Sequence, residues 1–264
     1  MINRRYNKSV SRLSEEKNRL KKIKMFLLVL FFIAIFVGLF FVSRLESLQV
    51  SNVEVEGEKT ISKDDIRNAT FESISGRKFL IFPKTNIFLI NESQVASILS
   101  SEFPRIESAR VNKNANGVLK IEIKEREAVA SWCDSACYLL DSTGLIYSSV
   151  NNDLELFDKV VLRGAVEGDP LMKHFQNERI IKNYLDAIYL LDKNNIQVST
   201  IIVSSQDKAV FESSIGNIFV DPDSDDLLNA IENALLVIGD IKNKNPDAKF
   251  EYIDTRFGNK VFYK

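Results

Sequence analysis

The stretch MFLLVLFFIAIFVGLFFV, residues 25–42, decides how the rest of the chain is organised. Its eighteen residues carry no charge. At a rise of 1.5 Å per residue they would form a helix roughly 27 Å long, close to the hydrocarbon thickness of a bilayer. A helix on the surface of a soluble domain shows a polar face at 3.6-residue spacing, and this stretch has none. The sequence therefore predicts a transmembrane helix over residues 25–43.

A cleaved signal peptide is the competing interpretation of this stretch. A signal peptide has an apolar region of roughly 7–15 residues, followed by small residues at the cleavage site. Here the apolar run is longer, and Ser43-Arg44-Leu45-Glu46 follows it. The leader before it, residues 1–24, is also long for a signal peptide. These features favour an uncleaved signal anchor.

Basic residues dominate the leader, with nine Lys and Arg against Glu15 and Glu16. Lys and Arg that flank a membrane span remain on the cytoplasmic side. We therefore expect a single-pass protein of the cytoplasmic (inner) membrane, with a cytoplasmic N-terminus and an extracytoplasmic remainder from about residue 44. The whole chain has a net charge of −1 and the leader +7, which leaves about −8 for that remainder. This acidic balance argues against nucleic acid as a partner.

The first exported region, residues 50–127, combines strand and helix signals. Apolar and polar residues alternate where strands are expected, Ser62 and Asn91 are placed to cap helices, and Phe103-Pro104 would end the second helix. The expected elements are a strand at 53–57, helices at about 62–73 and 91–103, and strands at 106–112 and 118–125. The predicted order is strand, helix, helix, strand, strand.

In the second exported region, residues 128–264, the sequence pattern predicts a mostly antiparallel sheet with two helices packed on one face. The expected elements are a hairpin over 137–147, a strand at 160–164, a helix at 179–191, strands at 198–203, 209–212 and 217–221, a helix capped by Asp223-Ser224, and strands at 250–255 and 260–263. The fold class expected for the whole chain is α+β, with one transmembrane helix followed by two domains.

This order and four motifs resemble the FtsQ/DivIB family of bacterial cell-division proteins. The motifs are VEVEG at 53–57, FPRIESARV at 103–111, LKIEIKEREAVA at 119–130 and YIDTRFGNKV at 252–261. The resemblance implies a POTRA domain of order βααββ over residues 50–127 and an FtsQ-like β domain over residues 128–264.

The resemblance also implies a function. Members of this family are membrane-anchored divisome scaffolds at the division septum, which bind other division proteins and help to control septal wall synthesis. In the family, the C-terminal strand edge of the second domain binds FtsB, which is itself paired with FtsL, and an open strand edge can accept a partner strand. Carried over to this chain, the expected partner-binding residues are Arg256, Phe257, Gly258, Asn259, Lys260, Val261 and Phe262. The alternative for these residues is a simple terminal hairpin with Phe262 in the core.

Two cysteines, Cys133 and Cys137, lie in the exported part, where disulfides are permitted. On one extended strand, residues four apart are separated by about 13 Å, which is too far to bond. A disulfide therefore needs a turn, which residues 134–136 can supply. The sequence leaves both a disulfide and two free thiols open. Two cysteines alone do not complete a tetrahedral metal site.

Signals for catalysis are sparse. His174 is the only histidine, and the sequence has no Gly-rich phosphate loop, no HExxH motif and no cluster of metal ligands. We therefore expect no enzyme, no cofactor and no small-molecule substrate, which argues against a signal-anchored envelope enzyme. The alternative function is a POTRA-bearing component of a secretion or envelope-assembly system. Such a component would show tandem POTRA repeats or a barrel of alternating strands, and these 264 residues show neither.

Overall fold

The structure is a computed structural model that describes residues 2–78, 82–114, 116–150, 160–205, 208–258 and 260–264. It divides into two compact units. The first comprises Met1–Glu102 and Ser108–Lys124, and the second comprises Phe103–Glu107 and Glu125–Lys264.

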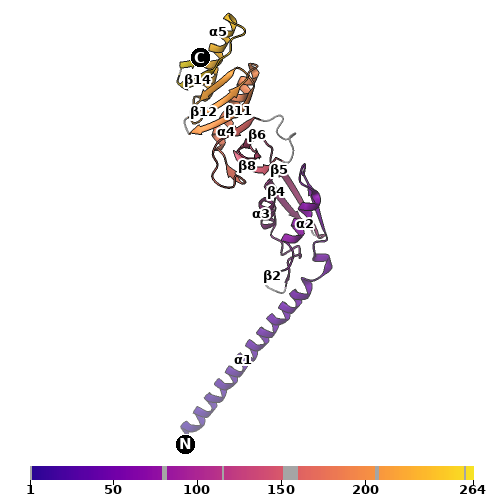
Figure 1. Ribbon diagram of the computed structural model, residues 1–264. Helices are drawn as coiled ribbons and strands as arrows, with labels where there is room; N and C mark the ends of the chain where they lie inside the picture. Colours follow the sequence, from indigo (N-terminus) through magenta and orange to yellow (C-terminus); the bar gives the residue numbers. More distant parts are fainter. Residues whose placement is uncertain (1, 79–81, 115, 151–159, 206–207, 259) are drawn as a thin grey trace. The chain divides into compact units, whose positions relative to one another are not determined.

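Helix α1, Ile2–Val42, contains the predicted apolar span (Figure 1). Within its part Arg19–Val42, an 18-residue window has a mean hydropathy of 3.2 and is not buried within the protein. Among the described residues, this is the one helix long and apolar enough to cross a membrane. An unburied helix that is apolar on all sides is stable in a bilayer, where its backbone groups are satisfied internally. The sequence predicted the helix only from residue 25, and the structure extends it through the basic leader.

A short 3₁₀ helix, η1 (Glu46–Leu48), follows α1 and leads into a three-stranded sheet. The elements are β1 (Asn52–Glu56), α2 (Lys63–Ser73), β2 (Arg77–Lys78), β3 (Phe82–Pro83), α3 (Glu92–Glu102), β4 (Ile106–Lys113) and β5 (Val118–Glu125). The sheet order is β1-β5-β4, with β1 parallel to β5. This is the predicted strand, helix, helix, strand, strand order. The short β2–β3 hairpin is an addition where the sequence predicted no strand.

Alternation along the strands creates the core of this sheet. Val53 and Val55 of β1 are buried, and β5 buries Leu119 and Ile121 on the same face. Helix α2 begins as predicted, because Ser62 Oγ accepts a hydrogen bond from the backbone N–H of Asp64 at 3.2 Å. Both helices turn an apolar side toward the core, with Ile66, Ala69, Val95 and Leu99 buried.

The second unit is built on a ten-stranded sheet of order β10-β8-β7-β6-β9-β11-β12-β13-β14-β15. The strands are β6 (Ala130–Cys133), β7 (Cys137–Leu140), β8 (Leu145–Ser149), β9 (Val161–Arg163), β10 (Lys173–His174), β11 (Val198–Ser205), β12 (Lys208–Ser213), β13 (Gly216–Val220), β14 (Tyr252–Phe257) and β15 (Lys260–Tyr263). The helices are α4 (Glu178–Lys193) and α5 (Leu227–Lys244). The prediction of a mostly antiparallel sheet with two packed helices is confirmed.

Three neighbouring pairs in this sheet are parallel, namely β6–β9, β9–β11 and β13–β14. Parallel neighbours need a crossover connection, which α4 provides before β11 and α5 before β14. Both connections step along the sheet in the same direction, so right-handed crossovers place both helices on one face. There they form one core with the sheet, in which Tyr184 of α4 packs edge-to-face on Phe211 of β12 at 5.6 Å between rings.

The structure of this unit differs from the prediction at the start of α5 and at strands β6 and β10, neither of which was predicted. Helix α5 begins at Leu227 with Asp226 as its N-cap, and the predicted cap Asp223-Ser224 lies in the preceding turns. Strand β6 was not predicted, because all four of its residues are buried and show no alternation.

Candidate functional site

Strand β15 lies at the end of the ten-stranded sheet, and no other described strand pairs with its outer side (Figure 1). Its inner side pairs antiparallel with β14. The backbone N–H of Lys264 donates inward, to the carbonyl of Tyr252 at 3.2 Å. Because the direction of hydrogen bonding alternates along an antiparallel strand, the N–H groups of Val261 and Tyr263 point outward. The outer side therefore offers backbone groups in the pattern that a partner strand would pair with.

A tight turn joins β14 to β15. It contains Gly258, whose φ of +64° lies in the left-handed region that favours glycine. The register of the hairpin is irregular between Asp254 and Phe257, and Phe257 then faces Lys260 across the turn. Asn259, one of the predicted partner-binding residues, lies outside the described residues.

Two aromatic side chains form the exposed tip of this hairpin. The rings of Phe257 and Phe262 are 5.4 Å apart and nearly perpendicular, the edge-to-face arrangement that aromatic pairs prefer. Phe257 is 56% exposed and Phe262 is 49% exposed. The alternative that placed Phe262 in the core is therefore wrong. Exposed aromatic side chains of this kind are frequent anchors of protein interfaces.

Arg256 is held in place by Asp254. Its Nε donates to Asp254 Oδ1 at 3.0 Å and its Nη2 donates to Oδ2 at 2.7 Å, a two-point ion pair. Burial by itself would raise the pKa of Asp254, but the hydrogen bonds from the Arg256 side chain and backbone outweigh it and lower the pKa. The guanidinium lies 5.6 Å from the centre of the Phe257 ring and 5.7 Å from that of Phe219. The ion pair therefore orients a cation beside the aromatic tip.

A row of side chains continues this surface across the open face of the sheet. Phe219 of β13 is opposite Asp254, which is opposite Phe262. Residues opposite each other point to the same side of a sheet, and this side is opposite to the helices because Ile253 points into the core. Tyr252 stacks on Phe219 at 5.7 Å. The sequence did not predict Phe219 and Tyr252 as part of this surface, although each is next to a buried isoleucine in its strand.

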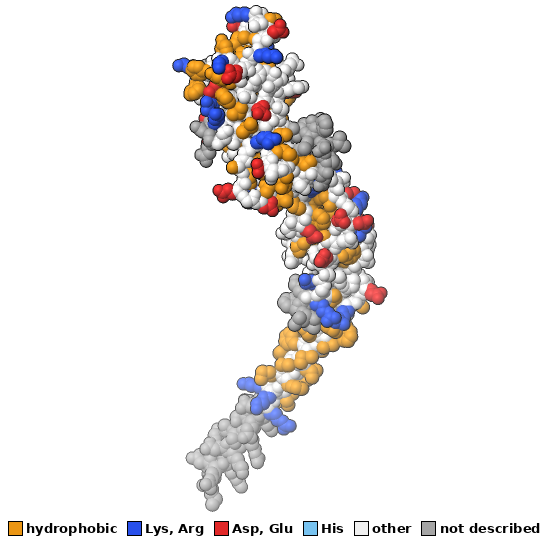
Figure 2. All heavy atoms as spheres, in the orientation of Figure 1, with side chains coloured by type: hydrophobic (Ala, Val, Ile, Leu, Met, Phe, Trp, Pro, Cys, Tyr) orange, Lys and Arg blue, Asp and Glu red, His pale blue; other side chains and the backbone are white. Residues whose placement is uncertain are grey.

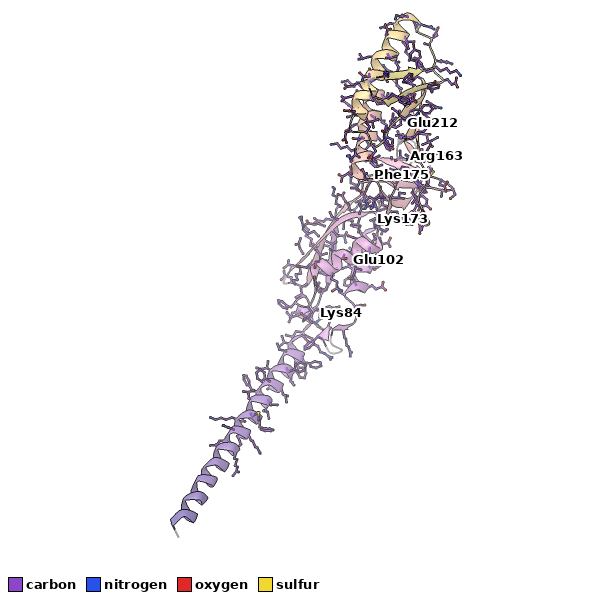
Figure 3. The ribbon with its side chains drawn as sticks, turned by 90° about the vertical axis from the view of Figure 1, so that its left-hand side faces the viewer. Lys84, Glu102, Arg163, Lys173, Phe175 and Glu212 are labelled. Carbon is purple, nitrogen blue, oxygen red and sulfur yellow. A yellow bond between two sulfur atoms is a disulfide. The ribbon has the colours of Figure 1, made fainter. Side chains whose placement is uncertain are left out.

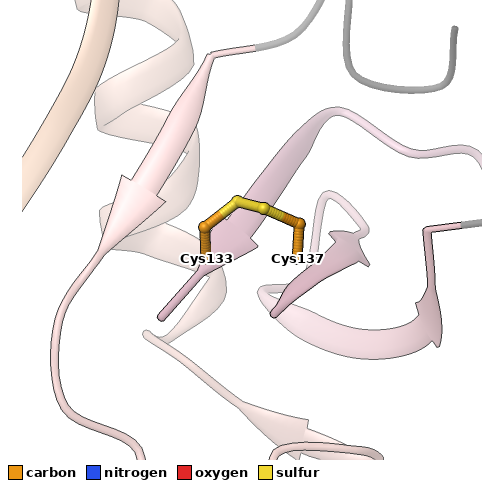
Figure 4. Close-up of a disulfide and its surroundings, with 2 residues drawn as sticks. All are labelled: Cys133 and Cys137. Carbon is orange, nitrogen blue, oxygen red and sulfur yellow. A yellow bond between two sulfur atoms is a disulfide. The ribbon is translucent and has the colours of Figure 1, made fainter. Parts of the chain in front are cut away.

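Cys133 and Cys137 face each other in the β6–β7 hairpin. Their Cα atoms are 4.2 Å apart and the structure joins their sulfur atoms in a disulfide (Figure 4). The turn that such a bond requires is present, since the N–H of Asp134 donates to the carbonyl of Ala136 at 3.0 Å. The neighbouring Trp132 is buried against Phe175, with 6.5 Å between the rings (Phe175 is labelled in Figure 3).

His174 lies on β10, where it is exposed and pairs with Leu145. Within the part of the chain that the structure describes, no group of three or more His, Cys, Asp or Glu could hold a metal ion.

Comparison with known families identifies the domain that follows α1. Residues 48–126 match the family model of the POTRA domain, FtsQ-type. This chain carries an FtsQ-type POTRA domain. With the apolar helix α1 ahead of that domain, the resemblance to FtsQ/DivIB-type proteins is confirmed. No curated protein matches the chain. The match ends at Arg126, so the candidate partner-binding edge lies beyond it.

Proposed function

We propose that this protein is a membrane-anchored divisome scaffold, which binds other division proteins through the extracytoplasmic edge of β15 and helps to control septal wall synthesis. The FtsQ-type POTRA domain behind a single apolar helix supports a scaffold role in cell division. The observation that carries the proposal is the outer side of β15, with which no described strand pairs, beside the exposed pair Phe257 and Phe262. The proposed partners are an FtsB-like protein and the FtsL-like protein paired with it.

The edge would bind its partner by strand addition. A partner segment in extended conformation pairs with the outward N–H groups of Val261 and Tyr263, and these backbone bonds supply affinity without sequence preference. Side chains supply the preference. Phe257 and Phe262 offer aromatic surface, with Arg256 oriented beside it by Asp254, and the exposed Lys260 favours a partner that carries carboxylates near its apolar residues. Of the predicted binding residues, Gly258 shapes the turn and Val261 packs partly against the core.

The proposal places the protein in the inner membrane with its leader, residues 1–24, in the cytoplasm. The basic excess of the leader supports this orientation. The proposed organisation behind it is a span at 25–43, the POTRA domain at 50–127 and the β domain at 128–264. In this proposal the protein has no catalytic, cofactor or small-molecule role, and its work is binding.

Localisation in living cells tests the divisome proposal. A fluorescent protein fused to the cytoplasmic N-terminus should form a band at midcell in dividing cells. A uniform envelope signal would contradict the proposal and would favour the secretion or envelope-assembly alternative.

A further inference from the structure

The C-terminal end of α1 is held by side chains and backbone groups of the POTRA domain that follows it. The carbonyl of Ser43, the residue that directly follows α1, accepts hydrogen bonds from Gln49 Nε2 at 2.8 Å and from Asn86 Nδ2 at 2.9 Å. Asn86 is buried, and its Oδ1 accepts from the N–H of Phe88 at 3.0 Å. The backbone N–H of Ile87 also donates to the carbonyl of Leu48 at 2.9 Å. The loop that carries Phe88 is therefore fixed against the helix end, where a span of this length reaches the membrane surface.

An apolar groove of about 370 Å³ opens between this loop and the last turn of α1. It is lined by Leu39, Val42, Ser43, Leu48, Phe82, Asn86, Phe88 and Leu89. Phe88 is 71% exposed, and Phe82 contacts Phe36 of α1 edge-to-face at 5.9 Å between rings. Exposing this much apolar surface to water is unfavourable, whereas at the edge of a bilayer the same surface meets acyl chains.

A basic pocket of about 250 Å³ adjoins the groove, lined by Arg44, Gln49, Arg77 and Pro83. The two cavities lie close to each other, since Ser43 and Phe82 line the groove and the residues that follow them, Arg44 and Pro83, line the pocket. Figure 2 shows Lys and Arg side chains gathered where the apolar part of α1 ends, and Figure 3 places Lys84 at the same end of the POTRA unit. Glu46 is the only acidic residue in the sequence between 43 and 50, and there is none between 74 and 91.

We propose that the groove and the basic pocket together bind one anionic phospholipid from the leaflet that surrounds the C-terminal end of α1. The apolar groove takes an acyl chain along Leu39, Val42 and Phe88. The guanidinium groups of Arg44 and Arg77 bind the phosphate, for which planar guanidinium is well suited. The excess of basic over acidic residues around the pocket selects a lipid with net negative charge over a zwitterionic one. The proposal rests on insertion of α1 into the membrane and is independent of the partner-binding role of β15.

The experiment uses the full-length chain in nanodiscs, with Phe88→Trp as a reporter in the groove. Two bilayers of equal charge are compared, in which brominated acyl chains, which quench indole fluorescence, are carried either by phosphatidylglycerol or by phosphatidylcholine. Trp132 is buried in the second unit, so unsubstituted protein gives the background to subtract. We expect roughly two- to fivefold stronger quenching of the introduced indole by brominated phosphatidylglycerol. The double substitution Arg44→Gln/Arg77→Gln should remove the difference, whereas Lys182→Gln/Lys193→Gln on α4 should preserve it.

Three results would overturn the proposal. Equal quenching by both brominated lipids would mean that Phe88 is immersed without selection of an anionic lipid. Absence of quenching in protein shown to be inserted, by protection of α1 from protease in the same nanodiscs, would mean that no lipid occupies the groove. A selective signal that survives Arg44→Gln/Arg77→Gln would also contradict the assigned headgroup contacts.

Discussion

Arg256 and Asp254, two residues apart on β14, are joined by a two-point ion pair beside the edge strand β15. The Asp254 side chain is only 10% exposed, so its charge depends on Arg256 and on the Arg256 N–H, which donates to Oδ1 at 3.2 Å. Across the hairpin the Asp254 backbone pairs with Phe262. The pair therefore connects the stability of the β14–β15 hairpin to the position of its exposed aromatic tip.

The ion pair should make the stability of the protein depend on pH. Because the pKa of Asp254 is lowered in the folded protein, its contribution to stability is complete above the ordinary Asp pKa of about 4 and is lost as pH falls through the lowered value. At neutral pH, Asp254→Asn should reduce the free energy of unfolding by roughly 1–3 kcal/mol. Urea unfolding of detergent-solubilised protein measures this. The difference between the two proteins should shrink below about pH 4, and an unchanged difference at low pH would contradict this account.

The disulfide should make the protein more stable without reductant than with it. Closing a loop between Cys133 and Cys137 contributes about 2 kcal/mol in the loop-entropy model. The variant Cys133→Ser/Cys137→Ser should lose about this amount and should no longer respond to reductant. Thiol labelling of the unreduced exported protein is the direct check, and modification of both cysteines would show that the bond is absent.

Breaking a buried ion pair in the second unit should reduce the free energy of unfolding by more than loss of the disulfide does. Arg126 Nη1 donates to Asp141 Oδ2 at 2.8 Å, and both side chains are largely buried. Asp141 also accepts from the N–H of Thr143 and of Leu145, which shapes the β7–β8 turn. Arg126→Met leaves a buried carboxylate without its cation and should cost roughly 3 kcal/mol in urea unfolding followed by Trp132 fluorescence. Asp141→Asn preserves the turn contacts and should cost less. Equal losses in the two variants would contradict this assignment.

Removing an aromatic side chain from the exposed tip should weaken partner binding and leave the domain folded. Phe257→Ala should weaken binding of the FtsB-like partner roughly tenfold or more, because exposed aromatics at an interface contribute strongly. The matched control is Tyr189→Ala on α4, an aromatic that is 72% exposed and lies outside the hairpin. Affinity is measured by titration with the partner in nanodiscs. Similar affinities for both variants would argue against the hairpin as the binding site.

Most elements follow from the sequence because their signals are local. The apolar run at 25–42, the cap Ser62 and the alternation in β1 and β5 each depend on neighbours only a few residues away. The FtsQ-type motifs were equally local. The family match at 48–126 includes those at 53–57 and 103–111 and the start of the one at 119–130, whereas the motif at 252–261 lies beyond the match.

The features that the sequence did not predict depend on distant parts of the chain. The sequence of strand β6 shows no alternation because all four of its residues are buried. In the sheet it lies between β7 and β9, and β9 is distant from it in the sequence. The parallel pairing of β13 with β14 requires α5 as a crossover, which alternation within a strand does not reveal. Phe219 and Tyr252 join the candidate site through the pairing of their strands, so sequence proximity to Arg256 and Phe257 gave no signal for Phe219.

The most direct test of the proposed function is the affinity of the FtsB-like and FtsL-like pair for full-length protein in which the outer side of β15 is altered. Val261→Pro removes an outward N–H, which an edge strand tolerates, whereas Val261→Ala preserves the N–H and shortens the side chain that packs partly against the core. We predict that Val261→Pro weakens binding roughly tenfold relative to Val261→Ala, with similar urea unfolding of the two variants. Equal affinities of the two folded variants would contradict binding by strand addition at β15.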